Sequence, residues 1–122
     1  KDNHIVAAGG VAQAFVAVRK LRPDIAIEIE VDSLDQLQEA LDAGADLVLL
    51  DNMSPELLSQ AVHIANEHSA RTGKPVVLEA SGGITLASAT AVARSGVRFI
   101  SVGALTHSAP VLDIGLDLQS IT

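Results

Sequence analysis

The sequence contains no cysteine, tryptophan or tyrosine, and its 122 residues include only two phenylalanines, Phe15 and Phe99. Without cysteine there can be no disulfide bond, thiolate metal site or cysteine nucleophile. With so few aromatic side chains there is no surface on which the bases of single-stranded nucleic acid could stack. Basic residues are also scarce, because 8 Lys and Arg face 15 Asp and Glu, giving a net charge of −7. This balance argues against nucleic-acid binding, and a small molecule is the expected partner.

Long apolar runs are missing as well. No stretch approaches the roughly 20 residues that a membrane-spanning helix needs, and residues 1–4 do not resemble the start of a signal peptide. We therefore expect a cytoplasmic protein that does not bind a membrane. The hydrophobic fraction of 48% is ample for the core of one domain. Since the chain begins with Lys1 and no strand precedes the first helical pattern, we expect a piece of a longer protein.

Four short apolar runs alternate with helical patterns. The runs are residues 25–31, 47–51, 76–80 and 98–102, and such alternation predicts βα units around a parallel sheet. Helix boundaries are marked by Pro23, by Ser33 with Gln36 as a capping box, by Ser54 before Pro55, and by Gly44, Gly73 and Gly96. The side chains expected to face the core are Val11, Phe15 and Val18 in the first helix, Leu34, Leu37 and Leu41 in the second, and Leu86, Ala89, Val92 and Ala93 in the last.

The first strand separates a barrel from an open sheet with helices on both faces. Ile25, Ile27, Ile29 and Val31 share one face, whereas Ala26, Glu28, Glu30 and Asp32 share the other. Three carboxylates would be costly in a dry layer between sheet and helices. They fit a face that looks into the solvated mouth of a barrel. We therefore predict a partial, TIM-like (β/α) barrel with parallel strands, since a complete barrel needs about 250 residues.

Two glycine-containing turns follow the third and fourth strands, where a barrel places its working residues. Ser81, Gly82 and Gly83 form the first turn, and Gly103 with Ala104 forms the second. Glycine lets backbone N–H groups come close to an anion, so the pair predicts a phosphate site. The alternative is that these glycines only permit tight turns.

Carboxylates end the first two strands, at Glu30 and Asp51. Such a pair can hold Mg²⁺ together with a phosphate, or stabilise positive charge that develops on a sugar carbon. Capping of the following helices is the alternative, more plausible for Asp51 than for Glu30. Lys1 is a candidate cation for an anionic substrate or a solvated terminal residue, and His107 could bind phosphate or cap its helix.

Five ordered motifs carry a family resemblance. They are Lys1-Asp2-Asn3-His4, Glu28-Ile29-Glu30-Val31-Asp32-Ser33, Leu49-Leu50-Asp51-Asn52-Met53, Leu78-Glu79-Ala80-Ser81-Gly82-Gly83-Ile84 and Val102-Gly103-Ala104-Leu105-Thr106-His107. Together they resemble quinolinate phosphoribosyltransferase, also called decarboxylating nicotinate-nucleotide pyrophosphorylase. The segment 113–117 is similar to the C-terminal segment of that family.

The resemblance implies a reaction. The family condenses quinolinate with phosphoribosyl pyrophosphate, using Mg²⁺, to give nicotinate mononucleotide, pyrophosphate and carbon dioxide in NAD biosynthesis. It works as a dimer and combines an N-terminal α/β sandwich with an open barrel. Residues 1–108 would then be the barrel part, and residues 109–122 would pack on an N-terminal domain absent from this chain.

The resemblance also implies roles for single residues. Lys1, Glu30 and Asp51 would be catalytic and contact substrate, and Glu30 and Asp51 would hold Mg²⁺, directly or through water. Ser81, Gly82, Gly83, Gly103, Ala104 and His107 would bind the 5′-phosphate.

The arginines depart from what quinolinate requires. Its two carboxylates call for arginines, but Arg19, Arg22, Arg71, Arg94 and Arg98 lie on helices, near helix ends or at the start of a strand. The basic residues that bind quinolinate in the family come from upstream of Lys1. Two alternatives therefore stay open: a phosphate-binding fragment without activity of its own, and a related phosphoribosyltransferase with another acceptor.

Overall fold

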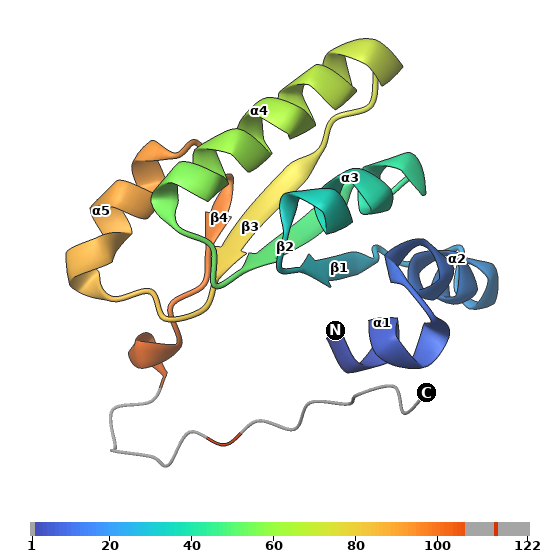
Figure 1. Ribbon diagram of the computed structural model, residues 1–122, viewed down its shortest axis with the longest axis horizontal. Helices are drawn as coiled ribbons and strands as arrows, with labels where there is room; N and C mark the ends of the chain where they lie inside the picture. The colour runs from blue at the N-terminus through green and yellow to red at the C-terminus, as the bar shows by residue number, and fades with distance from the viewer. Residues whose placement is uncertain (1, 107–113, 115–122) are drawn as a thin grey trace.

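The computed structural model describes residues 2–106 and 114 (Figure 1). Strands and helices alternate after two N-terminal helices. The elements in chain order are α1 (Asp2–Ala8), α2 (Val11–Leu21), β1 (Glu28–Val31), α3 (Leu34–Asp42), β2 (Leu47–Asp51), α4 (Pro55–Thr72), β3 (Val77–Ser81), α5 (Leu86–Arg94), β4 (Phe99–Ile100) and the 3₁₀ helix η1 (Gly103–Leu105). No helix among the described residues has the length and apolar character needed to cross a membrane.

The four strands form one parallel sheet in the order β1-β2-β3-β4, so each strand pairs with its neighbour in the sequence. Figure 1 shows α3, α4 and α5 on one side of this sheet. Parallel strands in sequence order with their helices on a single side make an arc of a (β/α) barrel. The prediction of a partial barrel is therefore confirmed.

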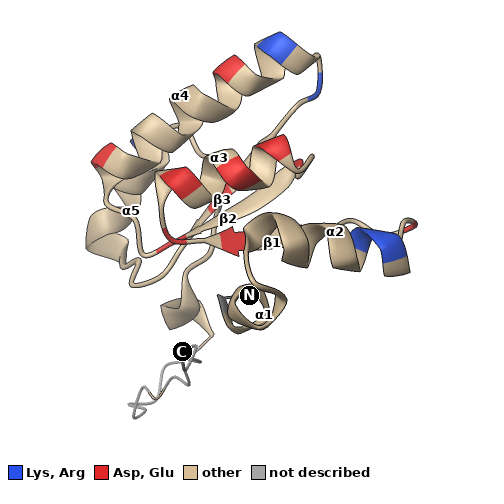
Figure 2. Cartoon of the chain, turned by 45° about the vertical axis from the view of Figure 1, so that its right-hand side comes forward, with Lys and Arg blue, Asp and Glu red and all other residues tan. Residues whose placement is uncertain are grey.

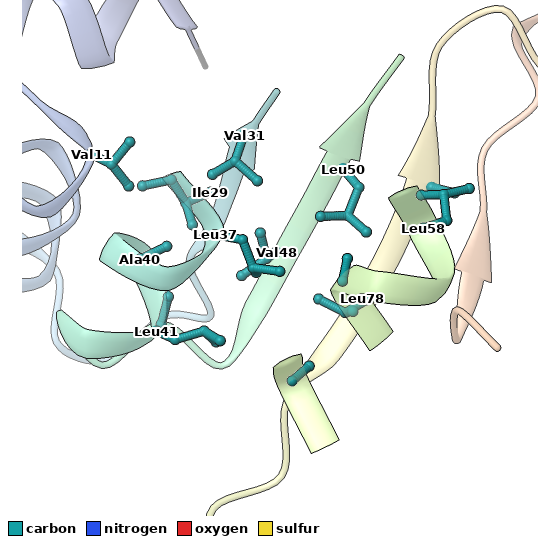
Figure 3. Packing of buried hydrophobic residues seen from close by; sticks show 14 of the residues in the cluster. Val11, Ile29, Val31, Leu37, Ala40, Leu41, Val48, Leu50, Leu58 and Leu78 are labelled. Atoms are coloured by element: carbon teal, nitrogen blue, oxygen red, sulfur yellow. The ribbon is translucent and has the colours of Figure 1, made fainter. Parts of the chain in front are cut away.

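The two faces of the sheet differ in chemistry. Ile29, Val31, Val48, Leu50, Leu78 and Ala80 are buried, and Figure 3 shows several of them packed with Leu37 and Leu41 of α3 and Leu58 of α4. The register places Glu28, Glu30, Asp51, Glu79 and Ser81 on the opposite face. The predicted alternation in the first strand is confirmed from Ile27 to Val31, and the acidic side chains of β1 avoid the dry layer.

Side chains that cap helices lie where the sequence predicted them. Ser33 Oγ accepts from the Gln36 backbone N–H at 3.4 Å, and Ser54 Oγ accepts from that of Leu57 at 3.3 Å. Gly73 ends α4 in the left-handed conformation, with φ of 71°. The Gln36 side chain differs from the expected capping box, because its Oε1 accepts from the Asp32 N–H at 3.0 Å and not from that of Ser33.

Element boundaries differ from the prediction at several places, and the third strand is shifted by one residue, to Val77–Ser81. Residues 2–8 form a separate helix, α1, which was not predicted from the sequence. The first strand begins at Glu28 and not at residue 25, because β2, its partner, begins only at Leu47, opposite Glu28. The fourth strand is limited to Phe99 and Ile100, which pair with β3 alone.

Part of the predicted core is exposed. The exposed fraction is 43% for Val18 and 93% for Leu86, and Ala93 is exposed as well. Of the four side chains expected to point inward from α5, Val92 is buried and Ala89 is partly buried. The prediction for Leu86 and Ala93 was wrong because β4 is only two residues long, and within the described part of the chain no further strand pairs with β4 in the sheet.

Candidate functional site

The carboxyl ends of the four strands bring the predicted site residues to one edge of the sheet. Glu30 lies on β1, Asp51 ends β2, Ser81 ends β3, and Gly103 opens η1 shortly after β4. Asp51 and Ser81 are direct partners in the β2–β3 register. Because the strands are parallel, these positions share one edge, and Glu30, Asp51 and Ser81 also share the face that α3–α5 leave open.

A small cavity joins the two acids. It has a volume of about 140 Å³ and lies against Glu30, Asp32, Gln36 and Asp51, with Ile5 and Val6 of α1 on the other side. The structure therefore brings Glu30 and Asp51 together, as the sequence predicted. The lining contributed by α1 was not predicted.

Glu30 and Asp51 could bind a metal ion whose remaining ligands are substrate phosphates and water. Among the described residues there is no group of three or more His, Cys, Asp or Glu side chains placed to hold a metal ion. Mg²⁺ does not need such a cage, since it is commonly bound by one or two carboxylates together with substrate phosphates and water. Glu30 and Asp51 on one cavity fit that mode of binding.

The two turns carry backbone N–H groups that have no partner among the described residues. Gly82 and Gly83 adopt φ of 88° and 58°, which favours glycine at both positions. Within the described part of the chain, the N–H groups of Gly82, Gly83, Gly103 and Ala104 donate no hydrogen bond to another residue. Such groups at a strand end can donate to a phosphate.

Gly82 also has a structural reason to be glycine. A Cβ at this position would lie 2.6 Å from Cγ and 2.8 Å from the backbone nitrogen of Asn52. For Gly82 a phosphate ligand and a tight turn were both expected possibilities, but Asn52, which directly follows Asp51, was given no role. Part of the space that Gly82 leaves is therefore filled by the neighbouring loop.

Further acids line the open face. The Ser101 hydroxyl donates to Glu79 Oε1. The pKa of Glu28 is raised by its partial burial, and in addition by the charge of Glu79, by a hydrogen bond with Glu79 and by the charge of Glu30. Folding thus shifts the ionisation equilibrium of Glu28 toward the protonated form.

Because of this raised pKa, we expect the substitution Glu28→Gln to stabilise the folded protein by an amount that depends on pH. A raised folded-state pKa gives stability that is complete below the ordinary pKa and is lost as the pH rises through the raised value. The neutral amide avoids that loss, so the variant should be more stable than the parent near pH 7, whereas the difference should shrink near pH 4. Denaturant titrations at both pH values measure the gain, and a gain of equal size at both would contradict the assignment.

Comparison with known proteins identifies the family. Residues 1–117 match the model of "Quinolinate phosphoribosyl transferase, C-terminal domain". The chain belongs to this family. It is 47% identical over 118 residues to the nicotinate-nucleotide pyrophosphorylase [carboxylating] of Mycobacterium leprae, and 43% identical over 119 residues to the human protein of that name. These matches cover 97% of this chain but only 40% and 39% of the relatives.

Solved structures of the quinolinate phosphoribosyl transferase family agree with the fold. The nicotinate-nucleotide pyrophosphorylase of Francisella tularensis superposes with a TM-score of 0.76 at 48% identity, over 86% of this chain and 35% of that one. The chain therefore corresponds to the C-terminal domain of its relatives and spans about two fifths of their length.

The described basic residues lie away from Glu30 and Asp51 in this member of the quinolinate phosphoribosyl transferase family. Figure 2 shows conspicuous basic stretches at the C-terminal ends of α2 and α4. Those helix ends lead into the amino ends of β1 and β3, at the edge of the sheet opposite the candidate site. The described Lys and Arg residues all precede a strand in this way: Arg19, Lys20, Arg22, Arg71, Lys74, Arg94 and Arg98.

Two predicted site residues, Lys1 and His107, lie outside the described residues. So does most of the segment 109–122, which we expected to pack on another domain. Their roles stay predictions.

Proposed function

We propose that this chain supplies the phosphoribosyl site of a full-length enzyme that joins quinolinate to phosphoribosyl pyrophosphate. The products are nicotinate mononucleotide, pyrophosphate and carbon dioxide. Membership of the quinolinate phosphoribosyl transferase family supports the reaction, and the meeting of Glu30 and Asp51 on one cavity is the observation that carries the assignment to this edge. The word "carboxylating" in the relatives' name refers to the reverse direction of the same reaction, in which nicotinate mononucleotide takes up carbon dioxide.

The chemistry proposed for the acids follows from charge. As pyrophosphate leaves C1′ of the ribose, positive charge develops on that carbon. The fixed carboxylates of Glu30 and Asp51 stabilise this charge more than they stabilise the ground state, and this difference accelerates the reaction. Mg²⁺, held by the same two side chains directly or through water, would neutralise the departing pyrophosphate.

The turns are proposed to bind the 5′-phosphate. The N–H groups of Gly82, Gly83, Gly103 and Ala104 donate to no other described residue and could donate to a phosphate, and Ser81 adds a hydroxyl at the end of β3. Lys1 and His107 complete the proposed contacts with substrate. A homodimeric parent and a cytoplasmic location belong to the proposal on the strength of the family resemblance.

One observation favours a second candidate, a phosphate-binding domain without activity of its own. Among the described residues, no Lys or Arg lies at the carboxyl edge, so the two carboxylates of quinolinate have no cationic partner there. The missing cations would come from the rest of the full-length protein. A related enzyme with a different acceptor is compatible with the same observation.

Calorimetry and product analysis separate these candidates. The full-length protein should bind phosphoribosyl pyrophosphate with Mg²⁺ and form nicotinate mononucleotide when quinolinate is added, as measured by chromatography. The isolated chain should bind the donor without turnover. Turnover by the full-length protein with another pyridine acid but not with quinolinate would reassign the acceptor, whereas failure of either protein to bind the donor would refute the phosphoribosyl site.

A further inference from the structure

We propose that Asn52 is a positioning residue, which holds the carboxylate of Asp51 and fastens it to the turn after β3. The role rests on the proposed function, since Asn52 would act through an acid of the same site. Asn52 has no role among those predicted above from the sequence or from the family resemblance.

The first observation is a short hydrogen bond. Asn52 Nδ2 donates to Asp51 Oδ2 at 2.7 Å. A hydrogen bond to an ionised carboxylate is stronger than one between neutral groups. Asp51 is the last residue of β2 and lies on the sheet face opposite the buried core, so this bond limits the rotation of a side chain that lines the cavity.

The second observation is that Asn52 is itself fixed. Its backbone N–H donates to the Ser81 carbonyl oxygen at 2.9 Å, continuing the β2–β3 pairing beyond the last register pair. Its side-chain amide packs so closely on Gly82 that any Cβ there would collide with it. The amide that holds Asp51 is therefore anchored to the neighbouring loop.

The third observation is the backbone conformation. Asn52 has φ of 53° and is the one non-glycine residue with positive φ among those described. Asparagine tolerates this region better than most residues. The left-handed backbone allows the side chain to turn back toward Asp51 while the main chain still bonds to Ser81. An acid and a glycine turn on different strands thus become one rigid unit.

Two substitutions in the full-length enzyme test the role. Asn52→Gly keeps the left-handed backbone and removes the amide, and Asn52→Asp keeps the shape but places a carboxylate against Asp51. Each should lower kcat by about 10- to 100-fold, the usual cost of losing a group that orients a ligand side chain, with little change in the KM for phosphoribosyl pyrophosphate. Asn66→Asp, an exposed position on α4, is the matched control and should not change kcat.

A double-mutant cycle separates positioning from general structural support. If Asn52 acts through Asp51, then Asn52→Gly should cost little further turnover in an Asp51→Ala background. A loss of the same size in both backgrounds, or no loss in either, would overturn the proposal.

A crystal structure of full-length Asn52→Gly gives an answer that does not need turnover. We expect the Asp51 carboxylate to leave its present orientation. An unchanged orientation would refute the role of Asn52 whatever the enzyme does. Failure of the parent enzyme to use quinolinate would refute the proposed function alone, because the carboxylate orientation would still decide the question of Asn52.

Discussion

Replacing Glu30 or Asp51 by alanine in the full-length enzyme is expected to lower kcat by about 10²- to 10³-fold, the range seen when one fixed electrostatic partner of a transition state is removed. Both side chains line the same cavity at the carboxyl ends of β1 and β2. Their charge matters most when the ribose carbon becomes positive, so the loss should appear in kcat. Steady-state kinetics with saturating quinolinate and Mg²⁺ measures it.

The change in the KM for phosphoribosyl pyrophosphate should be smaller than the change in kcat, unless the altered acid is the main ligand of the metal. In that case the Mg²⁺ concentration needed for half-maximal activity should rise in the same variant. Titration of activity with Mg²⁺ therefore distinguishes an acid that binds the metal from one that only stabilises the sugar.

Asp46→Ala is the matched control for Asp51→Ala. Asp46 is exposed and directly precedes β2, whereas Asp51 ends the same strand. The control removes the same charge at the opposite edge of the sheet and should leave kcat within about twofold, as expected for a surface change away from the site. Retained turnover in both site variants, or an equal loss in the control, would remove the catalytic assignment of the two acids.

The alternation of residue types in the first strand was enough to predict the architecture. Glu28 and Glu30 alternate with Ile27, Ile29 and Val31, and no arrangement with helices on both faces could bury the acids without partners. The structure confirms this division of faces. Such a pattern is local, so a single sequence contains it.

The edges of the sheet could not be predicted in the same way. Phe99 is 52% exposed and Leu86 is 93% exposed, although their residue types are typical of a core. Whether an apolar side chain is buried depends on which elements pack against it. The helical spacing of α5 does not indicate whether another element packs beyond β4. The helix α1 was missed for a related reason, because a stretch of seven residues is too short to show a clear helical period.

Some residues of the candidate site could likewise be predicted from the sequence, whereas Asn52 could not. Glu30, Asp51 and Ser81 were predicted because the carboxyl ends of parallel strands must share an edge. Asn52 was given no role from the sequence because its proposed role depends on a contact with Gly82, which lies 30 positions later in the chain. A position can require glycine because a neighbouring side chain occupies the place of a Cβ, or because a ligand does. The sequence alone does not distinguish these two cases.

Two glycines with nearly the same φ make this difference measurable. Gly82 has φ of 88° and Gly44 has φ of 91°. An added Cβ at Gly44 would have no heavy atom within 4 Å, whereas one at Gly82 would lie 2.8 Å from the backbone nitrogen of Asn52. Gly44→Ala therefore reports the cost of the left-handed conformation, and Gly82→Ala reports that cost together with a collision.

We expect Gly44→Ala to lower the free energy of unfolding by about 1–2 kcal/mol, the cost of placing a Cβ in the left-handed region. Gly82→Ala should cost roughly 1–3 kcal/mol more, as overpacking does, because the Asn52 backbone is bonded to Ser81 and cannot simply move away. Denaturant titration of the full-length protein, which contains both positions, gives the difference between the two variants.

Turnover should separate the two glycines even more clearly. Displacing Asn52 in Gly82→Ala disturbs the carboxylate of Asp51 and the proposed phosphate turn together, so kcat should fall by at least about 100-fold, the upper range for loss of an orienting group. Gly44 lies between α3 and β2, at the opposite edge of the sheet, and its alanine variant should keep nearly full activity at temperatures where it stays folded. Equal losses of stability and of turnover in the two variants would show that the contact between Asn52 and Gly82 contributes nothing, and with it the coupling of Asp51 to the glycine turn would be lost.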